Sequence, residues 1–572
     1  MGSKPSRQPG TNTDRLPAAR PGALAIGSAF LVAALLPAST WVEFLQHPIR
    51  VERLGEVPST TISGVGLLRM TAAVASVAWL AWPAVARRLL GDTTPASRRD
   101  HGTTRRGTLA ILAVIVTVGM VLRAARLGES LWYDEIAALI SSSLHGPGPA
   151  LGNYHALANH AFHSALVAIS LDLLGSQDAE LAIRLPAFLA GVACIPAMFV
   201  LGRRVDGDRF GLVAAMLVAL MPVAILESAE ARGYSLMMLF AILATVSWLD
   251  LLEGRSRSVG PYAILVALGC WSHLVFACVP LGHAVHVVGR AARGDRDRRS
   301  IIVPVLGLAV GAITTLAILA PLLPDLLQRR TEFIALDGDE PSPLGIEGLM
   351  SLLQMGGSWT WWAALPGLGL LLIGGTESLR WPSVRTVATA GLAGGVVAIV
   401  LAIGGGSWIY ARFLVFLVVP ATMLMATGLR AVGELGRRPT LAVATSIVVL
   451  AAWSASLALL PPKQPIREAV ELARGLVDPA TDAIWSIGLG DDVAMFYTEG
   501  RGPRTIHAPG LGRDLDSTML RSGPDVAVVL YPDLVTKETR ERMEEAGFRV
   551  EGEFEGWLDW GHGDVVVMRR TE

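Results

Sequence analysis

Apolar runs of roughly twenty residues recur along the chain from Gly22 to Leu460, with short polar segments between them. Each run is long enough to cross a hydrocarbon layer about 30 Å thick as an α-helix. The pattern predicts membrane-spanning helices at 22–41, 63–86, 108–125, 182–201, 210–226, 234–252, 261–274, 276–290, 301–320, 360–375, 386–405, 412–429 and 440–459.

The pattern changes after residue 460. Strand-like runs such as Ala483 to Ile487 alternate with helix-like runs such as Lys537 to Ala546, which predicts a small α/β domain. Earlier in the chain, the segment from His155 to Leu174 has the apolar periodicity of a helix that lies in a membrane interface. The predicted fold class is an all-α polytopic membrane domain with interfacial helices in its first outer loop, followed by this α/β domain.

Composition agrees with this prediction and excludes several classes of protein. Of 572 residues, 52% are hydrophobic and 17% charged, and the mean hydropathy of +0.49 is too high for an ordinary soluble protein. The net charge of -1 is uninformative, because positive and negative residues are segregated by loop, and no basic face suggests nucleic-acid binding. All three cysteines lie in apolar stretches, so no disulfide framework is expected.

Basic residues orient the spans. They cluster in the N-terminal tail and in the loop from Arg87 to Arg106, which the positive-inside rule places in the cytoplasm. The span at 108–125 then ends on the outer side, and thirteen spans leave the C-terminus outside. We predict four regions: a cytoplasmic tail (1–21), two added helices with a basic loop (22–107), a transmembrane catalytic domain (108–460) and an extracytoplasmic domain (461–572).

An acidic pair, Asp134 and Glu135, follows the apolar run Leu131-Trp132-Tyr133 at the outer end of the third span. Such a pair either caps a helix at the interface or acts in chemistry. A carboxylate held at this level can accept a proton from a hydroxyl group.

Five motifs follow one another on the predicted outer side. They are the LWYDE run at 131–135, Asn159-His160 with the later Arg184-Leu185-Pro186, the run from Glu230 to Leu236, Trp271-Ser272-His273, and Tyr410 to Phe413. This order resembles the integral-membrane glycosyltransferases of the large-membrane-helix (GT-C) class that use polyprenyl-phosphate sugars. The class includes protein O-mannosyltransferases and lipid A aminoarabinose transferases. The resemblance covers about 108–430; the first two spans fall outside it, and Ala161 replaces the family's proline.

The resemblance implies an inverting transfer in which a carboxylate deprotonates the acceptor and polyprenyl phosphate leaves. It implies catalytic roles for Asp134 and Glu135, and we assign Asp134 as the general base. Arginine is a suitable residue to bind the phosphate, because its guanidinium group forms bidentate pairs with oxyanions. Substrate and phosphate binding are therefore expected from Arg412, Arg232, Arg184, Tyr234, Glu227, Glu230 and Asn159. His160 and His273 could jointly hold a divalent metal ion, and no other cofactor is indicated.

The expected partners are a polyprenyl-phosphate-linked sugar, with mannose or arabinose favoured, a glycan, lipid or protein acceptor, and membrane lipids. The expected location is the bacterial cytoplasmic membrane. Two alternatives stay open: a transporter or flippase of lipid-linked sugars, and a non-catalytic envelope assembly protein. A transporter places ionisable residues deep within its spans, whereas here the acidic residues lie at the outer ends, which favours the enzyme.

Overall fold

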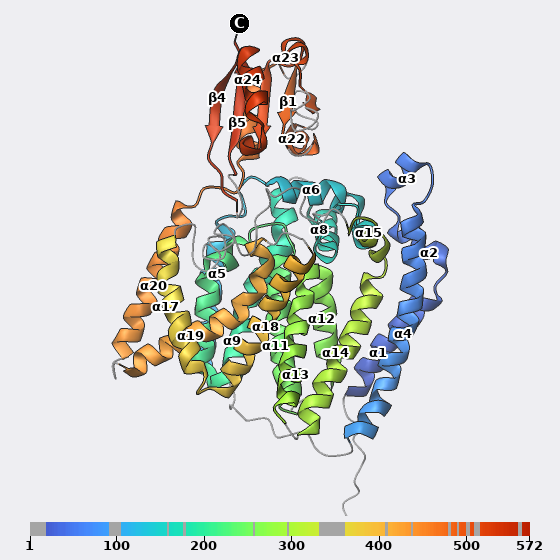
Figure 1. Cartoon of the computed structure of the whole chain (residues 1–572), viewed down its shortest axis with the longest axis vertical. Helices are drawn as coiled ribbons and strands as arrows, with labels where there is room; N and C mark the ends of the chain where they lie inside the picture. Colours follow the sequence, from blue (N-terminus) through green and yellow to red (C-terminus); the bar gives the residue numbers. More distant parts are fainter. Residues whose placement is uncertain are drawn as a thin grey trace, which may run out of the picture.

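A computed structural model describes residues 19–90, 105–156, 159–175, 179–254, 258–294, 297–330, 361–405, 410–435, 439–478, 482–488, 491–498, 504–507, 515–558 and 563–571. Most of the predicted cytoplasmic tail and part of the basic loop after the second span therefore lie outside the described residues. Helices form a bundle, and a small α/β domain stands at one end of it (Figure 1).

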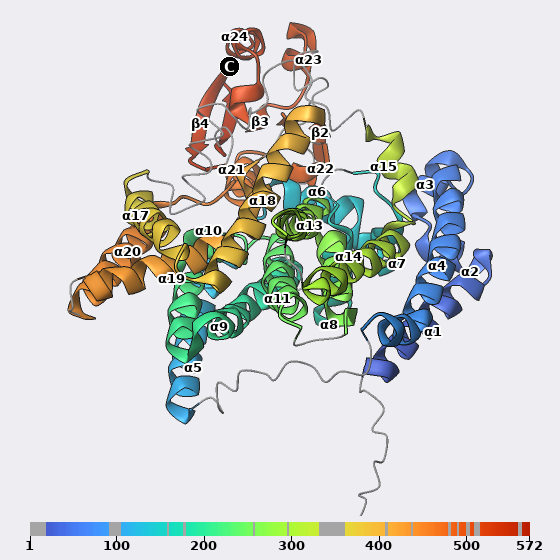
Figure 2. The same cartoon turned by 60° about the horizontal axis from the view of Figure 1, so that its bottom comes forward.

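The N-terminal helices lie beside this bundle, as the second view shows (Figure 2). They are α1 (Ala19–Leu35), α2 (Ala38–Leu45), α3 (Pro48–Leu54) and α4 (Ser59–Leu90). The chain bends by 95° between α1 and α2, where Pro37 stands before α2 and cannot continue a helix. The predicted first span is therefore a broken one.

The bundle is built from apolar helices that bury large aromatic and aliphatic side chains, among them Trp248, Tyr262 and Phe276. Its helices are α5 (Arg106–Ala124), α9 (Ala179–Leu220), α10 (Pro222–Leu226), α11 (Tyr234–Leu252), α12 (Gly260–Ser272), η2 (Leu274–Ala277), α13 (Cys278–Ala292), α14 (Arg298–Leu319), α17 (Trp361–Ser378), α18 (Pro382–Gly405), η4 (Ala411–Leu417), α19 (Val418–Leu435) and α20 (Pro439–Leu459).

Helix α9 is a hairpin of two helices. Asp206 and Gly207 leave helical geometry, and Gly207 has a φ of +83°, which glycine adopts without steric cost. The two arms then pack closely, because a Cβ on Gly202 would lie 2.8 Å from the Cα of Gly211. Both spans predicted at 182–201 and 210–226 fall on this hairpin.

The predicted total of thirteen spans is not confirmed. Among the described residues, nine helices are long and apolar enough to cross a membrane, or ten if the bent α1–α2 pair is one span. Helix α9 holds two predicted spans but counts once. Two further predicted spans are not among the nine: α12, which has only 13 residues, and α17, which begins with two tryptophans and contains Pro366.

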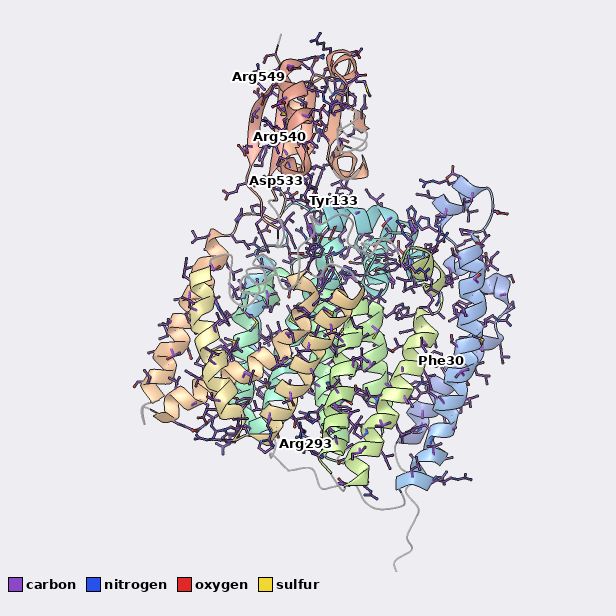
Figure 3. All side chains as sticks on the ribbon, in the orientation of Figure 1. Phe30, Tyr133, Arg293, Asp533, Arg540 and Arg549 are labelled. Atoms are coloured by element: carbon purple, nitrogen blue, oxygen red, sulfur yellow. The ribbon has the colours of Figure 1, made fainter. Side chains whose placement is uncertain are left out.

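Short helices cover one end of the bundle, next to the α/β domain (Figure 1). They are α6 (Tyr133–Ser141), η1 (Ser143–His145), α7 (Pro147–Gly152), α8 (Ala161–Leu174) and α15 (Leu323–Gln328). Helix α8 is the helix that the apolar spacing of 155–174 predicts. Arg293, in a loop rich in arginine, lies at the opposite end of the bundle from Tyr133 (Figure 3).

The C-terminal domain contains a five-stranded sheet in the order β2-β1-β3-β5-β4. Strand β1 pairs in parallel with β2 and β3, and β5 pairs antiparallel with β3 and β4. Its elements are α21 (Ile466–Gly475), β1 (Ala483–Ile487), α22 (Asp491–Thr498), β2 (Arg504–His507), α23 (Ser517–Ser522), β3 (Val526–Leu530), η6 (Pro532–Leu534), α24 (Lys537–Glu545), β4 (Phe548–Phe554) and β5 (Val565–Arg570). An α/β domain was expected here.

Candidate functional site

Asp134 lies in the first turn of α6, between two arginines from distant parts of the chain. Its Oδ2 is 3.5 Å from Nη2 of Arg232 and 3.5 Å from Nη2 of Arg412. Both contacts are longer than the 2.7–2.9 Å of a strong charge-assisted hydrogen bond. The aspartate keeps 20% of its side chain exposed, whereas the arginines are buried. The carboxylate is therefore flanked by two positive charges and still accessible.

The two guanidinium groups are held in place by aromatic neighbours. Arg412 donates from Nε to the hydroxyl of Tyr234 at 3.1 Å and stacks on Tyr410, with 4.2 Å from its Cζ to the ring centroid. Trp132 lies 5.3 Å from the same Cζ. Burial disfavours the charge on Arg232, but the Asp134 carboxylate raises the pKa of Arg232 above its ordinary value. Both cations are thus fixed and charged.

Asp134 opens onto a cavity of about 580 Å³. At the polar end, Asp134 is joined by Tyr154, Asn159, His160, Arg232 and Arg412. Apolar residues line the rest, from the end of α14, from η2 and α15, and from α18: Leu274, Val275, Leu319, Leu322, Leu326, Ala398 and Leu401. Leu401 is 58% exposed on the flank of the bundle, so the apolar end reaches the surface that would face lipid.

Glu135 has a different environment from its neighbour. Its carboxylate pairs with Arg184 through two hydrogen bonds, of 2.9 Å from Nε and 2.7 Å from Nη2. It also accepts the backbone N–H groups of Trp132 and Ala231. The remaining Arg184 donors bond to the carbonyls of Leu127, Glu129 and Ser130.

This buried pair corrects two expectations. Glu135 does not line the cavity and is not placed to take a proton from a substrate. Arg184 already has carboxylate or carbonyl partners for its guanidinium, so it is not placed to bind a phosphate. Both residues fix the start of α6, because an unpaired charge at this depth would cost several kcal/mol.

The other two glutamates also stand away from the cavity lining. Glu230 pairs with Lys463, with 2.7 and 2.8 Å between Nζ and its two oxygens, and both side chains are buried. Burial raises the pKa of Glu230, and the Lys463 ammonium opposes that rise. Glu227 is buried beside α11, where its carbonyl accepts the Ser235 hydroxyl. The sequence predicted that both glutamates bind substrate. Neither is placed to do so.

Two expected residues do meet in space: the rings of His160 and His273 lie 4.6 Å apart, and Tyr234 packs against both. The structure gives the metal hypothesis no third ligand, because the described residues contain no group of three His, Cys, Asp or Glu side chains placed for a metal. Each Nδ1 accepts a backbone N–H, from Gly233 and Val275, so in the neutral ring the proton lies on Nε2. Burial and the charge on Arg232 hold the pKa of His160 well below its usual range. We therefore assign these rings to the cavity wall.

Asn159 reaches the cavity as expected. Its amide nitrogen donates to the carbonyls of Ala150 and Asn153, while its Oδ1 is buried with no hydrogen-bond partner among the described residues. A buried acceptor in a cavity wall is suited to a hydroxyl donor from a ligand.

The sequence did not single out four residues that complete this region. Tyr154 lines the cavity, and Lys463, Gln464 and Tyr531 approach α6 from the C-terminal domain. Lys463 and Gln464 directly follow the last predicted span. The predicted outer position of that segment was the one feature of the sequence that could have indicated their place near the site.

Part of the chain is similar to a known family. Residues 160–324 match the family model described as dolichyl-phosphate-mannose-protein mannosyltransferase. This confirms, for that part of the chain, the resemblance seen in the motifs. No curated protein matches the chain.

Two crystal structures of ArnT from Cupriavidus metallidurans share the fold. The apo structure has a TM-score of 0.52 at 13% identity and covers 81% of this chain and 98% of that chain. The structure bound to undecaprenyl phosphate has a TM-score of 0.50 at 13% identity, with coverage of 80% and 97%. The chain is thus a multi-pass integral membrane protein with an ArnT-like fold.

Proposed function

We propose that this protein is a membrane glycosyltransferase that moves a sugar from a polyprenyl-phosphate donor to an acceptor hydroxyl, with inversion at the anomeric carbon. One observation carries the proposal: Asp134 faces Arg232 and Arg412 in the lining of a cavity most of whose other residues are apolar or aromatic. This arrangement provides, in one cavity, a base for the acceptor hydroxyl, a cationic site for the phosphate and an apolar channel for the lipid.

The cavity suits a lipid-linked phosphate. The two arginines can accept the phosphate as it gains charge on leaving, since guanidinium groups pair with phosphate oxygens. The apolar walls from α14, α15 and α18 can hold the first isoprene units, and the exposed Leu401 marks the side from which they enter. The ArnT structure with undecaprenyl phosphate supports a donor of this class.

Asp134 is the proposed general base. When the phosphate binds Arg232 and Arg412, their loose contacts with Asp134 can give way to the donor, which leaves the carboxylate to accept the hydroxyl proton. The oxygen of the acceptor then attacks the anomeric carbon as the bond to phosphate breaks.

We propose mannose or arabinose as the sugar, and an outer-face location for the site in a bacterial cytoplasmic membrane. The match to a mannosyltransferase family model supports mannose. The position of Arg293 at the bundle end opposite Tyr133 supports a cytoplasmic N-terminus and an extracytoplasmic C-terminal domain (Figure 3).

Asp134→Asn tests the assignment. Transfer from polyprenyl-phosphate mannose or arabinose, each with a radiolabelled sugar, is measured with membranes of a deletion strain as acceptor. Loss of a general base is expected to lower kcat by roughly 100-fold to 10,000-fold. Asp172→Asn removes an exposed carboxylate on α8 and serves as the matched control, with wild-type turnover expected.

Equal transfer by wild type and Asp134→Asn protein would reject Asp134 as the base. Transbilayer movement of labelled donor without transfer would instead favour a flippase.

A further inference from the structure

Tyr531 has an unusual backbone conformation at the end of strand β3. Its φ of 52° and ψ of 62° lie in the left-handed region, and it is the one described residue other than glycine with a positive φ. A bulky residue in this region is strained, and such strain gathers where a side chain must be aimed in a set direction. Tyr531 is the residue that precedes η6, directly after β3.

The ring of Tyr531 is aimed at the helix that carries Asp134. It meets the ring of Tyr133 edge-on, with centroids 5.8 Å apart at 80°. Gln464, before α21, accepts the Tyr133 backbone N–H at 2.9 Å through Oε1. Tyr133 lies directly beneath the C-terminal domain, near Asp533 of η6 (Figure 3).

These contacts belong to a continuous apolar core between the two parts of the protein. Trp132 and Ile136 of the α6 region share this core with Ile466 of α21 and Val528 of β3. The hydroxyl of Tyr497, on α22, accepts the N–H of Leu131 at 2.8 Å. The backbone N–H groups of Leu131 and Tyr133 thus both donate to side chains of the C-terminal domain.

Burial raises the pKa of Tyr531 well above its usual range, and the negative charge of Asp134 adds to that rise. The tyrosine therefore stays neutral beside the carboxylate and can act as a fixed wall without competing for its proton.

We infer that Tyr531 is a positioning residue of the reaction: with Gln464 it holds the first turn of α6, so that the Asp134 carboxylate points into the cavity. This places the C-terminal domain within the catalytic apparatus. The structural part of the inference depends on contacts alone, and its catalytic consequence rests on the proposed function.

The test compares Tyr531→Ala with Tyr531→Phe in the full-length protein. Hydrogen exchange of residues 131–136, followed by mass spectrometry, reports whether the turn is held. Kinetics of sugar transfer report whether the position of this turn affects kcat. Tyr531→Ala is expected to speed exchange in this segment and to lower kcat by roughly 10-fold to 100-fold, because a small displacement of a catalytic group has effects of this size. The KM for the donor should not change, since Arg232 and Arg412 are untouched.

Tyr531→Phe keeps the ring contact with Tyr133 and is expected to restore both exchange and kcat. Phe548→Leu is the matched control, because Phe548 is buried in the second core of the same domain, away from α6. It weakens the domain but should leave exchange at 131–136 and kcat per folded molecule unchanged.

Wild-type exchange in Tyr531→Ala protein would overturn the inference, as would an equal loss of kcat in Tyr531→Ala and Phe548→Leu. If Asp134→Asn protein retains transfer while Tyr531→Ala still speeds exchange, the proposed base fails and the structural role of Tyr531 stands.

Discussion

The N-terminal helices and the C-terminal domain, both outside the resemblance to glycosyltransferases, contact the short helices beside the cavity, but they do so with different interactions. On the N-terminal side, Arg50 of α3 donates to both oxygens of Asp325 on α15, at 2.8 and 3.1 Å, and to Asn153. On the C-terminal side, an apolar core joins α6 to α21 and the sheet, with the Glu230–Lys463 pair beside it.

The two sides contact different elements of the cavity wall. Asp325 lies next to Leu326, which lines the apolar end, so the N-terminal contact positions the wall proposed to meet the lipid. Tyr133 lies next to Asp134, so the C-terminal contact positions the proposed base. The comparison predicts that damage on the first side changes donor binding, whereas damage on the second changes turnover or folding.

The largest effect is expected in α6, the helix that the C-terminal domain contacts, from Glu135→Gln. The substitution leaves the buried Arg184 without its counter-charge, which should lower the free energy of unfolding by about 3–5 kcal/mol. Urea unfolding in detergent micelles measures this loss, with Asp172→Asn as a control that should have little effect. The double variant Glu135→Gln/Arg184→Met removes both charges and is expected to recover part of the loss. A single variant as stable as wild type would show that Glu135 is not the anchor of α6.

A smaller effect is expected on the N-terminal side, from Arg50→Met. Asp325 would lose its charge partner but keep the Tyr154 N–H at 2.9 Å, so the loss of stability should be about 1–3 kcal/mol. Because α15 would then be less well held, the KM for the polyprenyl-phosphate donor should rise while kcat stays near wild type. Arg53→Met, which removes an exposed arginine from the same helix, is the control. A fall in kcat with an unchanged KM in the Arg50→Met protein would contradict the prediction that the N-terminal side affects donor binding and the C-terminal side turnover.

Much of the fold could be predicted because its cause is local. A run of apolar residues long enough for a membrane marks a helix without reference to partners, and the predicted spans fall on helical segments of the structure. The number of spans could not be predicted. A two-residue break at Asp206 and Gly207 turns α9 back on itself, and hydropathy alone does not define how a 13-residue helix such as α12 sits.

The candidate site could be predicted only in part, for a geometric reason. The sequence pointed to Asp134, Arg232 and Arg412, which the structure brings together. The prediction named Asp134 as the base, but the residues alone do not separate it from Glu135, because adjacent helical residues point about 100° apart, and which one faces a cavity depends on packing. Arg184 and Lys463 are far from their partners in sequence, so no local pattern shows that they form ion pairs.

The smallest effect concerns pH and should be confined to the N-terminal side. His47 and His155 pack together, with ring centroids 4.6 Å apart, next to Arg50 and Asp325. Burial, and then repulsion between neighbouring histidines, lowers the pKa of each from 6.5 to about 4.

Between these values the unfolded chain binds protons that the folded chain does not, so stability falls as the pH drops from 6.5 towards 4. Thermal unfolding in micelles at pH 7 and pH 5 should show a lower melting temperature at pH 5. The variant His47→Gln/His155→Gln should lose less between these pH values, because glutamine does not titrate and can still donate to the Ser141 carbonyl that His47 contacts. Hydrogen exchange should place the acid-induced opening in α2, α3 and residues 141–156, with the first turn of α6 unaffected. An equal fall of the melting temperature in wild type and variant would contradict this prediction, as would opening that begins in the first turn of α6. Either result would show that the N-terminal and C-terminal sides do not respond separately to pH.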